Sequence, residues 1–199
     1  MHRLYTTVVL LVLTVSELLS LGRPASAQLA ESRDQSRYLA WFLADRLTGS
    51  AFIILNGGPR QVVDQELENL RPIAAQFRMT IPPIPATTGD QRNDILATAG
   101  YLTGLLQSPA STPKCTSDCV ALFRLGVSIY VLFIIYDKHA DQTSLINGFV
   151  SLAETAELPN NLLAPLVYKV RLKAPGKEVR DEIVHLDKAV AAYLKEALR

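Results

Sequence analysis

Apolar residues recur at intervals of three or four along most of this chain, and that spacing limits the possible folds more than any other feature. The longest regular run lies near the C-terminus and consists of Val179, Ile183, Leu186, Val190, Tyr193 and Ala197. Such a run places its side chains on one face of an α-helix, as in a helix that packs along another helix. The spacing therefore predicts helices and argues against a sheet.

The same period predicts a first helix that begins near Ser32. Ser32 and Gln35 have the spacing of a capping box, in which each side chain hydrogen-bonds the other residue's backbone. The apolar period that follows stops at Gly49, a residue that often ends helices. The short apolar segment 51–55 fits either a strand or a helical turn.

A second helix is expected from Pro59, because proline suits the first helical position. Pro72 lacks a backbone donor, so we expect a kink or break near it. The proline-rich segment 81–88 predicts an extended connection, and Asp90 is a suitable N-cap for a third helix.

The most apolar segment outside the N-terminal region is 119–136. Its length favours a helix, since buried strands seldom exceed about 8 residues. Asp141 can start the next helix, which Pro159 would stop. Segment 163–170 fits helical spacing better than the alternation of a strand. Short connections between such elements predict an all-α fold, an antiparallel bundle of about six or seven helices.

The N-terminus has the pattern of a secretory signal. Arg3 precedes an apolar run, and Ala25-Ser26-Ala27 matches the small-residue cleavage pattern. Residues 1–27 are therefore predicted to be a signal peptide and 28–199 a single exported domain, periplasmic or secreted. Of 20 basic and 19 acidic residues, 18 of each lie beyond the predicted signal. This balance gives no reason to expect nucleic acid or an anionic membrane surface as the main partner.

The only two cysteines, Cys115 and Cys119, are expected to form a disulfide, because export implies an oxidising compartment. Residues four apart on a regular helix have nearly parallel Cα–Cβ bonds, so Cys115 must lie in the loop before the helix. Ser117 or Asp118 would then cap that helix. The spacing is not that of a redox C-x-x-C pair.

Two groups of residues are candidate metal ligands. Glu182 and His185 form an E-x-x-H pair, but carboxylate-bridged di-iron bundles need a second pair, which the chain lacks. Asp137, His139 and Asp141 alternate where a loop is expected and could approach one ion. A solvated helix face and a turn rich in capping residues explain the same residues, so no cofactor is predicted.

Gly57 and Gly58 precede a helix start and are candidates for anion binding through backbone donors, although a bare turn explains them equally. The basic residues between positions 169 and 180 are interleaved with or followed by acids, which indicates a solvated surface.

Abundant apolar helix faces and few convergent reactive residues favour a non-catalytic module that binds a protein partner or an apolar ligand. One alternative is a metal-dependent or hydrolytic enzyme that uses His139 or His185 with nearby carboxylates. Another is a membrane-associated component that uses segment 119–136. Insertion of that segment is disfavoured, because Arg124 would place a charge in the hydrocarbon layer.

Overall fold

A computed structural model describes residues 25–136 and 143–199 of the chain. Within these ranges the protein forms seven α-helices and no strands, which confirms the all-α bundle. In chain order they are α2 (Ala25–Leu55), α3 (Arg60–Gln76), α4 (Gln91–Gln107), α5 (Ser117–Ile135), α6 (Thr143–Thr155), α7 (Asn160–Arg171) and α8 (Gly176–Glu196).

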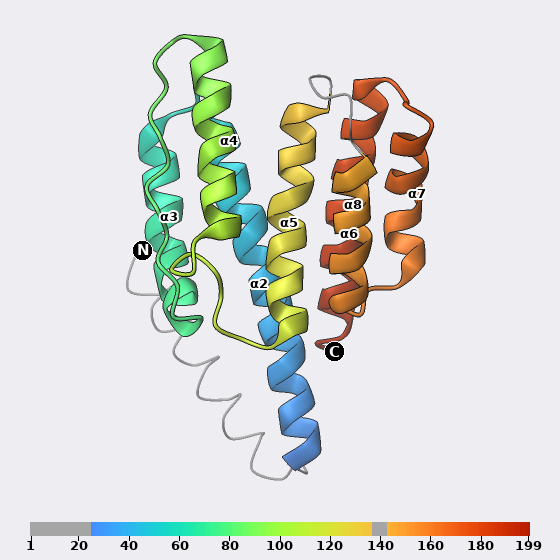
Figure 1. The fold of residues 1–199 in the computed structure, drawn as a ribbon. Coiled ribbons are helices and arrows are strands. Elements are labelled where there is room, and N and C mark those ends of the chain that lie inside the picture. The colour runs from blue at the N-terminus through green and yellow to red at the C-terminus, as the bar shows by residue number, and fades with distance from the viewer. Residues whose placement is uncertain (1–24, 137–142) are drawn as a thin grey trace.

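Helices α2 and α5 pack against each other in the middle of the molecule and form what we call the spine (Figure 1). On one side of it lie α3, α4 and the extended segment 81–88, which we call the strap; together they form the strap lobe. On the other side lie α6, α7 and α8, the helical lobe. Each lobe has its own apolar core, and both cores include residues of the spine.

A glycine allows the two spine helices to approach closely. A Cβ added at Gly126 of α5 would lie 2.8 Å from Cβ of Ala44 on α2 and 3.6 Å from the Trp41 ring. By length and composition both spine helices, over 32–55 and 117–134, are apolar enough to cross a membrane. Half or more of each segment is buried in the bundle, as expected of core helices.

The predicted limits of the first helix are wrong. Helix α2 begins upstream of Ser32, which therefore lies inside the helix and cannot cap it. The helix also continues through Gly49 to Leu55, so segment 51–55 is helical. A mid-helix glycine costs about 1 kcal/mol, which burial of Ala51 and Ile54 beyond it readily offsets.

Helix α3 is not broken at Pro72 but continues to Gln76. Leu70 and Ala74, on either side of the proline, are buried and hold that turn in place, while Pro72 itself faces outward. The extended strap is confirmed. So is the cap before α4, where the Asp90 carboxylate accepts a hydrogen bond of 2.9 Å from the Asn93 backbone.

Helix α5 confirms that the segment 119–136 is helical and that Cys115 lies in the loop before it. The residue preceding the helix is Thr116, so the predicted caps Ser117 and Asp118 lie in the first turn instead. Segment 163–170 is helical, within α7. The predicted start of α6 at Asp141 lies outside the described residues.

The seam of α8 is confirmed from Val179 to Val190 but is wrong beyond it. Leu194 is buried, whereas Tyr193 is 36% exposed and Ala197 follows the end of the helix. A straight helix has 3.6 residues per turn, so a strict seven-residue repeat drifts off its buried face unless the helix supercoils. The step of four from Val190 to Leu194 corrects that drift.

Candidate functional site

Hydrogen bonds hold the strap near both ends and at one point between. Just before it, the Thr80 backbone donates to the Ala110 carbonyl at 2.7 Å. Within it, the guanidinium of Arg60 on α3 donates to the Ile84 carbonyl at 2.9 Å. At its end, the backbone of Thr88 donates to the Asp94 carboxylate at 2.6 Å. The strap thereby lies between α3 and α4.

Asp94 attaches the strap to the first turn of α4. Its carboxylate also accepts bonds from the Thr88 hydroxyl at 2.9 Å and the Gly89 backbone at 3.2 Å. These bonds, led by the one from the Thr88 backbone, lower the pKa of Asp94. Asp94 is therefore charged at neutral pH and holds the strap with charge-assisted bonds.

A groove of about 360 Å³ runs between the strap and α4. Its floor is made by small residues at helical spacing on α4, Ala97, Gly100 and Gly104. A Cβ added at either glycine would meet no atom within 4 Å, so the missing side chains leave open space. The remaining lining residues are Pro82, Pro83, Pro85, Tyr101, Ser108 and Ser111.

Tyr101 is the polar residue that distinguishes this groove. It is 7% exposed, and within the described part of the chain its hydroxyl has no hydrogen-bond partner. Burial raises the pKa of Tyr101, so the phenol remains protonated and able to donate. A buried polar group without a partner costs about 1–3 kcal/mol, which makes this hydroxyl an unused donor beside a groove.

The opposite side of the strap offers a different surface. A groove of about 510 Å³ lies between the strap and α3 and is lined by four charged residues. Arg60 lies 2.8 Å from Asp64, and Arg71 lies 2.9 Å from Glu68. Because these charges neutralise each other in pairs, this groove has no excess charge with which to attract an ion.

A second group of polar residues lies where α8 meets the spine. It consists of Trp41 and Asp45 on α2, Tyr130 on α5 and Asp187 on α8. The Tyr130 hydroxyl donates to the Asp45 carboxylate at 3.2 Å. The indole N–H of Trp41 lies beside Asp187 and favours its charged form, although neither the indole nitrogen nor Asp187 Oδ1 completes a hydrogen bond.

Burial, reinforced by the negative charge of Asp45, raises the pKa of Asp187 to about 6. Arg46 and Lys188 act in the opposite direction but do not outweigh it. Burial and Asp45 also raise the pKa of Tyr130. This junction therefore changes its charge near pH 6 while it holds α8 against the spine.

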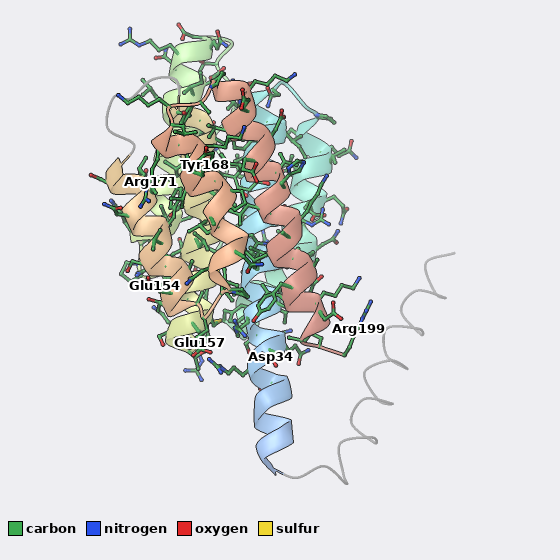
Figure 2. The ribbon with its side chains drawn as sticks, turned by 90° about the vertical axis from the view of Figure 1, so that its right-hand side faces the viewer. Asp34, Glu154, Glu157, Tyr168, Arg171 and Arg199 are labelled. Carbon is green, nitrogen blue, oxygen red and sulfur yellow. A yellow bond between two sulfur atoms is a disulfide. The ribbon has the colours of Figure 1, made fainter. Side chains whose placement is uncertain are left out.

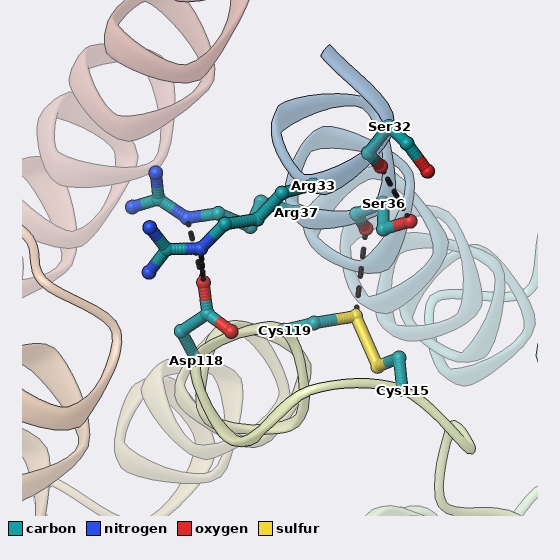
Figure 3. The surroundings of a disulfide bond; sticks show 7 residues. All are labelled: Ser32, Arg33, Ser36, Arg37, Cys115, Asp118 and Cys119. Atoms are coloured by element: carbon teal, nitrogen blue, oxygen red, sulfur yellow. Dashed lines mark hydrogen bonds and ion pairs between the residues drawn. A yellow bond between two sulfur atoms is a disulfide. The ribbon is translucent and has the colours of Figure 1, made fainter. Parts of the chain in front are cut away.

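The disulfide joins Cys115 to Cys119 and ties the start of α5 to the loop before it (Figure 3). The two Cα atoms are 6.0 Å apart, within the usual range. The Cys119 sulfur lies 3.6 Å from the Ser36 carbonyl oxygen on α2, a close contact without a donated proton because both sulfurs are oxidised. A disulfide fits an oxidising compartment.

Beside the disulfide, two arginines of α2 converge on Asp118 (Figure 3). Arg33 donates to its carboxylate at 2.9 Å, and the buried Arg37 has its Nε 3.5 Å away. Burial favours the neutral acid, but hydrogen bonds from Thr116, the Cys119 backbone and Arg33 outweigh it and lower the pKa of Asp118. The disulfide and this ion-pair cluster together fix the entry of α5 into the spine.

Of the predicted metal ligands, the structure describes only Glu182 and His185. Glu182 and His185 lie on α8 beside the seam, with His185 exposed. Asp137, His139 and Asp141 lie outside the described residues. Across 25–136 and 143–199, no three His, Cys, Asp or Glu side chains are grouped so that they could hold a metal ion.

Gly57 and Gly58 close the end of α2. Their backbone N–H groups donate to the carbonyls of Ile54 at 2.9 Å and Ile53 at 2.8 Å. Gly57 has a φ of +74°, a conformation that glycine adopts without strain. Both candidate donors are thus occupied within the chain, which leaves neither for an anion.

Sequence reasoning did not single out Tyr101 or Asp187. The sequence pattern that could have indicated the groove is the helical spacing of the small residues 97, 100 and 104, which predicts a helix face without large side chains. Asp187 stands four residues after Ile183 and so lies beside the seam. Neither pattern shows which residues of other helices lie opposite.

Comparison with known proteins adds no assignment. No protein-family model, no curated protein and no solved structure matches this chain. The candidate site therefore depends on the geometry of the strap, the groove and Tyr101.

Proposed function

We propose that this protein is an exported, non-catalytic binding module that takes a small, largely apolar ligand in the groove between the strap and α4. The observation that carries the proposal is the buried Tyr101 hydroxyl without a partner beside that groove. The ligand would carry a hydrogen-bond acceptor, such as a carbonyl oxygen, to accept from this phenol.

The composition of the groove supports binding rather than catalysis. Apart from Tyr101, whose pKa is raised, the lining consists of prolines, small residues and two serines, with no acid or histidine to activate a nucleophile. Apolar walls supply affinity, and one polar atom supplies orientation.

Access to the Tyr101 hydroxyl requires a local rearrangement of the groove, because the hydroxyl is sealed from solvent. The middle of the strap is anchored as well as its ends. Arg60 tethers the Ile84 carbonyl, and the Ile84 side chain is buried in the core of the strap lobe.

Export rests on the signal-like N-terminus and fits the presence of the disulfide. The intact mass of the protein purified from its own host tests it. Cleavage before Gln28 supports export, and the same spectrum under native conditions reports a retained ligand. An intact N-terminus in that spectrum would contradict the predicted cleavage.

Binding is tested with Nile red, an uncharged apolar dye that has a ring carbonyl and fluoresces in apolar surroundings. Gly104→Leu places bulk in the groove at a position where an added Cβ meets no atom within 4 Å, and it is expected to weaken dye binding at least about tenfold. Gly148→Leu on α6 is the matched control, because that helical glycine also faces open space. Wild-type affinity in Gly104→Leu, or no dye binding at all, would refute the proposal.

Tyr101→Phe separates a ligand contact from a structural role. Removal of an unpaired buried hydroxyl leaves the stability of the free protein unchanged or raises it. Loss of a ligand hydrogen bond of about 1 kcal/mol lowers the affinity for Nile red about fivefold. If Tyr101→Phe instead destabilised the free protein and left dye affinity intact, the hydroxyl would have a structural partner and no ligand role.

A further inference from the structure

The outer face of α7 carries two large apolar side chains that nothing in the described chain covers. Tyr168 is 63% exposed and Leu172 is 61% exposed, and they stand one helical turn apart. Helix α7 packs mainly on α6 and α8 and lies at the edge of the bundle (Figure 1). Single exposed apolar residues are common on protein surfaces, whereas two that lie together indicate a surface that contacts another molecule.

Three cations surround this apolar pair. Arg171, Lys173 and Lys177 are exposed, and none has a described acidic side chain within 4.0 Å. Lys169 differs from them, because it pairs with Glu178. The three cations at the turn are exposed, as the predicted solvated surface requires, but unlike Lys169 they are not paired with a described acid.

We use the name basic tip for Tyr168, Arg171, Leu172, Lys173 and Lys177. Figure 2 shows Tyr168 and Arg171 toward one end of the helical lobe, with Glu154 and Glu157 toward the other. The basic tip thus brings three exposed cations and two exposed apolar side chains to the same end of the lobe. An anionic surface would attract these cations.

We propose that the basic tip adsorbs to an anionic lipid surface, with Tyr168 and Leu172 at the headgroup level and the three cations against lipid phosphates. The tip is the end of a helix and its following turn, and the grooves described above lie on other elements. A bilayer surface accommodates a protruding tip because lipids rearrange around it, whereas a protein partner would need a matching hollow. No helix of the bundle has to insert.

The expected affinity is modest. Each cation near an anionic membrane surface strengthens binding about fivefold, and one partly buried leucine adds about tenfold. Binding should therefore depend on both charge and apolar area and should weaken as salt is raised.

Vesicle co-sedimentation of the full chain tests this inference, with phosphatidylcholine alone and with equal parts of phosphatidylcholine and phosphatidylglycerol. The wild type should bind only the anionic vesicles. Leu172→Ser should weaken binding about tenfold, and the combined change of Arg171, Lys173 and Lys177 to Gln should reduce it about a hundredfold. Leu96→Ser on α4 is the matched control, because Leu96 is also 61% exposed.

Three results would overturn the inference. The first is no binding to anionic vesicles by the wild type, and the second is an equal loss in Leu96→Ser and Leu172→Ser. The third is binding to soluble poly-aspartate that is tighter than binding to anionic vesicles and that Leu172→Ser does not weaken. That result would indicate an acidic protein as the partner. Far-ultraviolet circular dichroism verifies the fold of each variant, and Tyr168→Ser supplies a second apolar test.

Discussion

The two lobes on either side of the spine are built in different ways. In the helical lobe the turns after α6 and α7 have four residues each, 156–159 and 172–175. Both turns place a residue in the left-handed region, Glu157 with φ 54° and Lys173 with φ 52°, and both end in a proline before the next helix. Helix α3 also ends with a left-handed residue, Arg78 with φ 49°, but an extended strap held by side chains then leads to α4 in place of a short turn.

The two lobes also differ in which groups lack contacts within the described residues. In the helical lobe, regular turns satisfy the backbone at helix ends, and the uncovered groups are side chains on the outer face of α7. In the strap lobe, a proline-rich connection packs against a glycine floor and leaves a groove and an unpaired hydroxyl inside. A surface contact suits the first lobe and an enclosed ligand the second.

The largest expected effect is on the attachment of the helical lobe to the spine. Arg37 is 5% exposed and donates to the Ala156 carbonyl in the α6–α7 turn at 2.8 Å. Arg37→Ala leaves buried polar partners behind and should cost about 3 kcal/mol in the free energy of unfolding by urea. Hydrogen exchange should rise most in α6 and α7.

Arg33→Ala is the control for that change. The Arg33 side chain is 43% exposed and contacts Asp118 and, in the same α6–α7 turn, the exposed Glu157, so its loss should cost clearly less. Equal losses in the two variants would mean that the buried bond to the Ala156 carbonyl holds the lobe no better than the exposed ion pair with Glu157.

Removal of the disulfide should destabilise the protein on the strap-lobe side of the spine. The loop with Cys115 approaches α3, where the Lys114 backbone donates to the Phe77 carbonyl at 2.8 Å. Replacement of both cysteines by alanine should cost about 2 kcal/mol, since the closed loop is short. Hydrogen exchange should increase over 108–118 and remain unchanged in α7 and α8; an increase spread over both lobes would contradict a local role.

The junction of α8 with the spine should depend on pH. The Asp187 carboxyl has a pKa of about 6 in the folded protein against 3.8 for the free group, so the folded state binds the proton more tightly between these values. Stability therefore falls as pH rises from about 4 to about 7, by roughly 1 kcal/mol once partial exposure is allowed for.

Asp187→Asn should remove this dependence and stabilise the protein at pH 7. The single tryptophan, Trp41, lies beside Asp187, so its fluorescence should titrate near pH 6 in the wild type and not in the variant. A titration that persists in Asp187→Asn would assign the proton to another group.

The smallest expected effect is on stability, when one or the other of two spine glycines is replaced by alanine. Gly49 lines a groove between α2 and α3, and a Cβ there meets no atom within 4 Å. Gly49→Ala should stabilise the protein by about 0.5 kcal/mol through helix propensity. Gly126→Ala should have the opposite sign, because its Cβ would press on Ala44. Thermal unfolding distinguishes the two, and the same sign in both would show that the spine can relax.

Several predictions that depended on short local patterns succeeded. The strap, the cap at Asp90 and the helical state of 119–136 and 163–170 follow from proline content, a capping side chain and apolar period. The predicted end of the first helix at Gly49 failed because a helix-interior glycine costs only about 1 kcal/mol and burial of the next turn exceeds that. The predicted start at Ser32 failed because the helix already begins upstream of it.

From its sequence alone this chain is determined to be a bundle of amphipathic helices with a loop-to-helix disulfide, because period, length and cysteine spacing are local properties. Only the tertiary structure decided that the Tyr101 hydroxyl has no partner among the described residues and that Asp187 lies beside Trp41. It also decided that no described acidic side chain lies within 4.0 Å of the charged groups of Arg171, Lys173 and Lys177. Those features are relations between side chains on different turns and helices. The distances that create them, and the loss of water that shifts a pKa, arise only when the helices pack.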